Sequence, residues 1–168
     1  TSNPLENLQA QKVNASLINI IAIGEGLLEG AGLSDSAGDE LIVAQIVQIL
    51  KTGTDISSAA SIKSIIDTTS AGLSDAIKTK VDVLSNNVAQ SLANTNAQIN
   101  DAGSVSQIAT YQKATLDDTS SLLSSVISAV QSDSSTLEVV TAASIETQAK
   151  AAALDLGVNV SPFITLDS

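Results

Sequence analysis

The sequence contains no cysteine, histidine, methionine, tryptophan or arginine, so its seven basic residues are all lysines. Without cysteine the chain has no disulfide, no thiolate nucleophile and no thiolate metal site, and without histidine it has no Ser-His-Asp triad. A Ser-Lys arrangement remains formally available, but no glycine-rich turn surrounds any serine and no phosphate-binding loop is present. We therefore expect no enzymatic activity, no catalytic residue and no cofactor-binding residue.

Aromatic residues are almost absent, since Tyr111 and Phe163 are the only two. The core of this 168-residue domain must then be built from Ala, Val, Ile and Leu, which suits closely packed helices. Few aromatic anchors are left for the energetic centre of a tight interface. The absence of methionine indicates a mature protein or an excised segment.

Acidic residues outnumber basic ones, giving a net charge of −11 and a pI of about 4.1. The lysines are scattered along the chain, so such a protein repels nucleic acid and anionic membrane surfaces. The longest apolar stretch, residues 17–23, is interrupted by Asn19 and is far shorter than the ~20 residues of a membrane span. We expect no nucleic-acid partner and no membrane insertion.

Apolar residues recur at steps of three and four along five regions of the chain, which predicts helices. The Ser70-Ala71-Gly72 segment would divide the third region, which is otherwise longer than is usual for a globular helix. Asn3-Pro4 is a helix start signal, and Gly32 and Gly53 are helix stop signals. The apolar positions of the five regions extend from Leu5 to Leu28, Leu41 to Leu50, Ile62 to Ile99, Val105 to Val130 and Leu137 to Ala153.

This pattern predicts an all-α domain over residues 1–157, an antiparallel bundle of five or six helices of which two are long. Residues 158–168 contain Pro162 and alternate apolar and polar residues, which indicates a short extended C-terminal exit segment or linker. Gly24 and Gly26 inside the first long helix indicate either the close approach of another helix or a kink.

Two groups of acidic residues are the candidates for a carboxylate dyad or a calcium site. One comprises the adjacent pair Asp117-Asp118 with Asp101 and Asp133, and the other comprises Asp35, Asp39 and Glu40 around Gly38. Adjacent helical residues point about 100° apart and do not converge, and neither group has the ligand spacing of an EF-hand loop. We interpret both as solvated charges and helix caps, with no metal-binding residue assigned and at most weak calcium binding.

Two further features have one structural and one functional interpretation. Tyr111 lies on an otherwise aliphatic helix and is predicted to be a half-buried packing residue with a hydrated hydroxyl, rather than a recognition residue. The apolar seam from Leu73 to Leu92 has nearly coiled-coil spacing. It would pack either within the bundle or against another subunit in a filament or surface lattice.

Loose aliphatic patterns in several segments resemble a known family. Residues 3–5, 12–21, 30–32 and 54–66 resemble a helical segment of giant secreted proteins of cyanobacteria and proteobacteria, which carry cadherin-like or RTX-type calcium-binding repeats. Residues 154–167 look like the linkers that join such segments to the next β-domain. The resemblance implies a secreted or cell-surface location, a structural or adhesive role and, often, type I export. The Gly- and Asp-rich repeats themselves are not present in this chain.

Three functions are open at this stage. The first is a non-enzymatic structural or interaction module of a secreted bacterial surface adhesin, in contact with neighbouring domains of the same large protein. The second is a self-assembling subunit of an extracellular filament or surface layer, which predicts exposed apolar faces and contact with identical subunits. The third is a ligand-binding or enzymatic domain, which needs a cavity with convergent polar groups.

Overall fold

The computed structural model describes residues 4–34, 37–117 and 121–155, which form seven α-helices and no strand. The all-α class is confirmed, whereas the expected number of five or six helices is wrong. Two helices are long, α1 and α4, with 27 residues each. The helices are α1 (Pro4–Gly30), α2 (Gly38–Lys51), α3 (Ala59–Ala71), α4 (Asp75–Asp101), α5 (Val105–Leu116), α6 (Leu122–Gln131) and α7 (Ala142–Asp155).

The additional helix arises because the region predicted as one helix from Val105 to Val130 is divided into α5 and α6. Asp117 ends α5 in an extended conformation, with a ψ of 150°. Ser121 and Ser124 form a capping box at the start of α6, in which each side chain accepts a hydrogen bond from the other residue's main-chain N–H. Polar capping at this point outweighs the apolar periodicity, which continues across the break.

The predicted interruption at residues 70–72 is confirmed. Gly72 follows the last residue of α3, and Ser74 caps the N-terminus of α4 by accepting a hydrogen bond from the main-chain N–H of Ile77. The third predicted region is therefore two helices, α3 and α4, that pack against each other along much of α3.

Three helices end in the same main-chain motif, with a residue of positive φ just beyond the last turn. Gly32 (φ 118°) follows α1 and Gly53 (φ 71°) follows α2, at the stop signals seen in the sequence. After α6 this position is taken by Asp133 (φ 53°), and the main-chain N–H of Ser134 donates to the carbonyl oxygen of Ala129 at 2.9 Å. A non-glycine residue holds this conformation at a cost, because its Cβ crowds the neighbouring carbonyl.

The segment before α7 is not helical, although its apolar residues were predicted to belong to the last helix. Side chains of α4 bind its main chain instead. Asn87 donates to the carbonyl oxygen of Leu137 at 2.7 Å, and Asn94 donates to that of Val140 at 2.8 Å. The hydroxyl oxygen of Ser91 accepts from the N–H of Val140 at 2.9 Å. The predicted exit segment, residues 158–168, lies outside the described residues.

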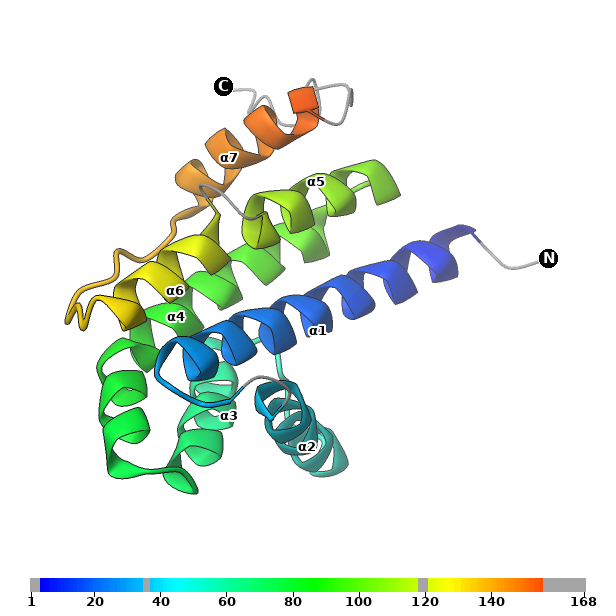
Figure 1. Cartoon of the computed structure of the whole chain (residues 1–168). Coiled ribbons are helices and arrows are strands. Elements are labelled where there is room, and N and C mark those ends of the chain that lie inside the picture. The colour runs from blue at the N-terminus through cyan, green and yellow to red at the C-terminus, as the bar shows by residue number, and fades with distance from the viewer. Residues whose placement is uncertain (1–3, 35–36, 118–120, 156–168) are drawn as a thin grey trace.

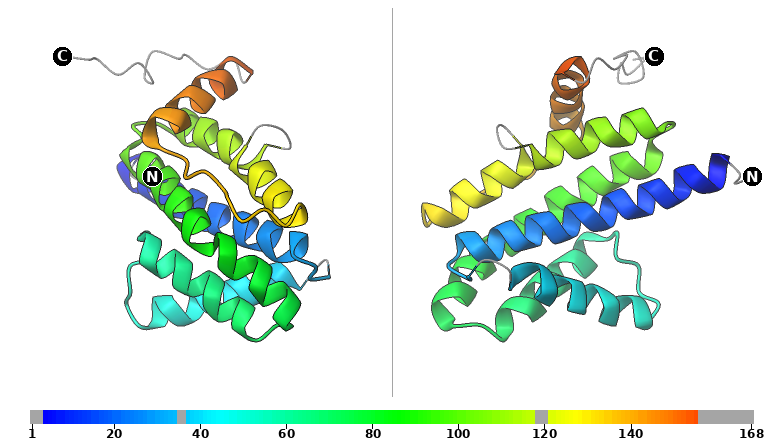
Figure 2. Two further views of the ribbon diagram at one scale, coloured as in Figure 1. Left: turned by 90° about the vertical axis from the view of Figure 1, so that its left-hand side faces the viewer. Right: turned by 45° about the vertical axis from the view of Figure 1, so that its right-hand side comes forward.

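The two long helices run through the middle of the molecule (Figures 1 and 2). α2 and α3 lie on one side of α1, and α5 and α6 lie on the other, where they follow one another roughly in line (Figure 2, right). α7 packs across α5 at the far end from α2 and α3. None of the helices in the described part of the chain has both the length and the apolar character needed to span a membrane.

The core is divided into a large and a small cluster of aliphatic side chains. The large cluster joins α1, α2, α3, α4 and α6, and the small one joins the N-terminal half of α1 and the end of α4 to α5 and α7. The apolar seam of α4 belongs to the large cluster, so it packs within the chain rather than against another subunit. Its fully buried members are Val81, Leu84, Val88 and Leu92.

Glycines on α1 allow close contact with two neighbouring helices. A Cβ at Gly24 would lie 2.9 Å from Cδ1 of Ile42 on α2, and a Cβ at Gly30 would lie 2.3 Å from Cγ1 of Val130 on α6. At Gly26 the nearest atom would be Cδ1 of Leu123, at 2.7 Å. Of the two interpretations drawn from the sequence, the close approach of another helix is confirmed.

Candidate functional site

The first group of acidic residues does not converge in the structure. Asp101 is the exposed last residue of α4. Asp133 lies beyond α6, with its Oδ1 2.9 Å from Nζ of Lys80, and Asp117 accepts a hydrogen bond from Lys113 at 2.6 Å. Asp118 lies outside the described residues. Among the residues that the structure describes, no group of three or more acidic side chains is placed to hold a metal ion.

The second acidic group marks the start of α2. Asp39 and Glu40 occupy its first turn, where negative charge interacts favourably with the helix dipole. Oδ1 of Asp39 accepts a hydrogen bond from the main-chain N–H of Glu40 at 2.8 Å. The N-cap position is Ala37, which has no side chain able to cap. Asp35 lies outside the described residues.

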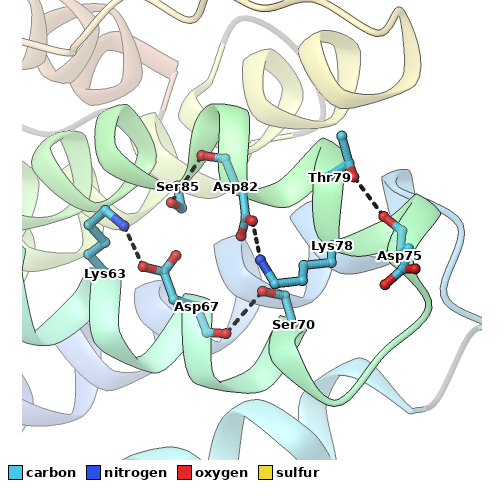
Figure 3. A network of polar contacts seen from close by, with 8 residues as sticks. All are labelled: Lys63, Asp67, Ser70, Asp75, Lys78, Thr79, Asp82 and Ser85. Atoms are coloured by element: carbon cyan, nitrogen blue, oxygen red, sulfur yellow. Dashed lines mark hydrogen bonds and ion pairs between the residues drawn. The ribbon is translucent and has the colours of Figure 1, made fainter.

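Other surface carboxylates pair with lysines one turn away on the same helix. Figure 3 shows Lys63 directed toward Asp67 on α3 and Lys78 directed toward Asp82 on α4. The hydrogen bond to Asp82 is the main reason that the pKa of Lys78 is raised. Exposed pairs of this kind contribute little to stability, because water and salt screen the charges. These carboxylates are surface ion pairs rather than a binding site.

Tyr111 is more buried than expected, with 7% of its surface exposed. It lies in the small cluster among Ile108, Ile145 and Ala149. Burial raises the pKa of its phenol above the ordinary value of 10.0, and the negative charges of Glu146 and Asp101 raise that pKa further. The prediction of a half-buried residue is therefore corrected, because α7 covers the ring.

The site that the structure reveals is a cavity of about 380 Å³ between α1, α4 and the loop that joins α2 to α3, here called the α1–α4 pocket. Two of its polar side chains are buried: Lys12 of α1 is 8% exposed and Asn96 of α4 is 2% exposed. Nζ of Lys12 donates to the main-chain oxygen of Asn100 at 2.6 Å. The loop contributes Asp55 and Ser57 to the rim.

A signal for this pocket is present in the sequence. Leu8, Ala15 and Ile23 follow one another at helical spacing along the inward side of α1, and Lys12 and Asn19 fall in the same row. Asn96 likewise follows Leu92 on the buried side of α4. Buried lysines are rare and need polar partners, so a lysine in an apolar row indicates either a helix-end contact or a binding site.

A second candidate site is an exposed apolar surface on α2. Ile42 and Ile46 face the core, yet Leu41, Val43, Val47 and Leu50 are between 37% and 50% exposed. Val43, Val47 and Leu50 follow at steps of four and three, so they form one stripe on the outer side of the helix. A helix that is apolar on both sides is normally covered on both. Leu41 lies on the other flank of α2, about 160° around the helix axis from Val43. We therefore call Val43, Val47 and Leu50 the α2 face.

Comparison of this chain with protein families, with curated proteins and with solved structures finds no match in any of the three. The α2 face and the α1–α4 pocket are therefore the two features of this structure that point to a function.

Proposed function

We propose that this chain is a non-enzymatic interaction module of a large secreted bacterial surface adhesin, and that it contacts a neighbouring domain of the same protein through the α2 face. The α2 face is the observation that carries the proposal, because it leaves three large aliphatic side chains in water along one side of a short helix. Contiguous exposed apolar surface on a folded domain marks an interaction site. The acidic, cysteine-free composition and the family resemblance support the extracellular location.

The arrangement of helices fits a spacer with one docking side. A turn of three residues joins α3 to α4. We infer that the two helices run antiparallel, as neighbouring helices of a bundle do. Helix α2 lies at the edge of this assembly and far from α7 (Figure 2). A neighbouring domain could cover it without disturbing either part of the core.

The alternative is a self-assembling subunit, and one observation favours it. Glu40 in the first turn of α2 and Lys51 in its last turn both lie on the exposed side of the helix. If two copies of α2 met in opposite directions, Glu40 of each copy would lie opposite Lys51 of the other. In this register Val43 of each copy would fall within one position of Val47 of the other. Such a contact is self-complementary, as a two-fold interface requires.

The mass of the purified chain distinguishes the two functions. It would be measured by light scattering over a concentration series, first with calcium and then with chelator. A constant mass of 17.0 kDa in both conditions supports the interaction module and excludes self-assembly of this segment. Growth of the mass with concentration supports the assembly subunit instead, and its reversal by chelator would show that calcium takes part.

Variants of the α2 face locate the contact. If the mass grows, Val47→Lys should restore the monomer, because a charge at the centre of the stripe opposes burial of the apolar surface. Val83→Lys, at a half-exposed valine on α4, is the matched control and should leave the mass unchanged. Glu40→Lys should weaken a two-fold contact, and the double variant Glu40→Lys/Lys51→Glu should restore it.

A further inference from the structure

The α1–α4 pocket has a buried positive end. An ammonium group has three N–H donors, and the main-chain oxygen of Asn100 takes one of those of Lys12. Lys12 forms no ion pair with a carboxylate of the described residues. Asn96 lies beside it on the pocket wall, and one N–H of its amide donates to the main-chain oxygen of Ser16 at 3.3 Å. Lys12 and Asn96 thus each keep at least one N–H group that an acceptor in the pocket could bind.

The role of Lys12 at the end of α4 does not account for the cavity. Asn100 is in the last turn of α4, where a cation interacts favourably with the free carbonyl groups. A lysine that served only this purpose could lie on the surface with its ammonium in water. Here Lys12 is 8% exposed and lies on the wall of a cavity within the ~300–1,000 Å³ range of small-molecule sites.

The rim of the pocket is negative. Oδ1 of Asp55 accepts hydrogen bonds from the N–H of Ser57 at 2.8 Å and from its hydroxyl at 2.7 Å. These bonds lower the pKa of Asp55, so the carboxylate stays ionised at neutral pH. They also fix one oxygen and leave Oδ2 with no hydrogen bond to the described residues. Between the two charged ends the wall is aliphatic and includes Val13 and Ile56.

We propose that the α1–α4 pocket binds a small zwitterion of the amino-acid class, with its carboxylate at Lys12 and Asn96 and its ammonium at Asp55. The buried donors match an anion, the exposed carboxylate matches a cation, and the aliphatic wall between them matches a short hydrocarbon chain. A simple anion would be repelled by Asp55 and by the net charge of −11. This site goes beyond the proposed function, because it uses a different surface from the α2 face.

The test is a titration of the whole chain with small probes. Binding is monitored by two-dimensional NMR, through the amide signals of the pocket residues. The probes are glycine, β-alanine, 4-aminobutyrate and 5-aminovalerate, with butyrate and butylamine as controls that carry one charge each. At least one of the amino acids should bind at millimolar concentration. It should bind about tenfold more tightly than either singly charged control, which is the worth of one hydrogen-bonded charge contact.

Two variants show where the probe binds. Ala97→Leu places a larger side chain on the pocket wall without removing a polar group, and it should abolish binding. Ala76→Leu is the matched control, since Ala76 is also exposed on α4 but does not line the pocket. Lys12→Met keeps the aliphatic stem and removes the ammonium, so it should weaken binding at least tenfold if the variant folds.

The outcomes that overturn the proposal are distinct. If none of the probes shifts the pocket amides, Lys12 serves only the end of α4. If butyrate binds as tightly as 4-aminobutyrate, the ligand is an anion and Asp55 has no part. If Ala97→Leu binds as the wild type does, the site lies elsewhere. None of these results depends on the mass measurement, so failure here leaves the α2 face untouched.

Discussion

Asn19 of α1 and Asn96 of α4 are joined by a buried hydrogen bond of 3.1 Å, from Nδ2 of Asn19 to Oδ1 of Asn96. The two residues are 77 positions apart in the sequence, and both are inaccessible or nearly so. Oδ1 of Asn19 has no hydrogen-bond partner among the described residues. The bond fixes how the two long helices lie against each other, while the unpaired oxygen costs free energy.

The two asparagines should therefore be strongly coupled. Asn19→Leu and Asn96→Leu should each lower the free energy of unfolding by about 1–3 kcal/mol, because each leaves a buried polar partner unpaired. The double variant should be nearly as stable as the wild type, since both polar groups are replaced by apolar groups of similar shape. Urea unfolding of the four proteins measures the coupling, and a double variant that shows the sum of the two losses would contradict it.

Gly30 should tolerate no side chain. Gly30→Ala places a Cβ 2.3 Å from Cγ1 of Val130, a β-branched residue with little rotameric freedom. The variant should lose about 1–3 kcal/mol of stability. Gly26→Ala should lose less, because the end of the flexible Leu123 side chain can move. Thermal unfolding measures both.

Gly72→Ala is the control for these variants. No heavy atom outside its own surroundings lies within 4 Å of a Cβ at Gly72, and its φ of −85° suits any residue. The free energy of unfolding of the Gly72→Ala variant should stay within about 0.5 kcal/mol of that of the wild type. A comparable loss at Gly72 would mean that close packing is not the cause at Gly30.

Asp133→Gly should stabilise the protein. Asp133 has a φ of 53°, which costs a residue with a Cβ about 1 kcal/mol relative to glycine. The variant loses the ion pair with Lys80, but Asp133 is largely exposed and such pairs contribute little. Urea unfolding should show a gain of up to about 1 kcal/mol. Asp133→Ala keeps the strain and loses the ion pair, so it should show no gain.

The protein should lose stability in alkaline solution because of Tyr111. Its pKa in the folded state lies above 10.0, so the folded state keeps the phenol proton where the unfolded state releases it. The stabilisation is complete below pH 10 and is lost as the pH rises toward the raised pKa. Tyr111 is the only tyrosine, and the chain has no tryptophan, so phenolate absorbance follows this one group directly.

Two comparisons test the alkaline transition. In denaturant the phenolate should form with an ordinary pKa near 10, below that of the folded protein. Tyr111→Phe should lose less stability than the wild type between neutral pH and this range. If the phenol titrates at the same pH with and without denaturant, the ring is not buried as described.

The sequence predicts much of the fold because most helices carry their signals locally. Leu84, Val88 and Leu92 reveal the buried side of α4 by spacing alone, and Gly32 and Gly53 mark two helix ends. The break after α5 is harder to predict, since the apolar pattern continues through it. Its local signal is the serine at position 121, which caps α6, but serines are so common in this chain that one is a weak signal.

The remaining differences between the predicted and the observed structure arise from contacts between residues that are distant in the sequence. The segment around Leu137 is apolar enough for a helix, but Asn87 binds its carbonyl group from 50 residues away. The same holds for the pocket. Lys12 and Asn96 are visible as polar residues in apolar rows, whereas the position of Asp55 at the rim depends on how the α2–α3 loop folds back. Local patterns carry no information about that arrangement.

The division of the core into two clusters determines how the chain would respond to tension. α7 joins the rest through the small cluster, chiefly through Ile145, Ala149 and Ala153, and none of its described side chains belongs to the large cluster. When the ends of the chain are pulled apart, α7 should detach at low force while the large cluster still holds, and single-molecule extension should show two separate steps. A domain built in this way lengthens before it fails, and its first step absorbs mechanical load that would otherwise reach the long helices.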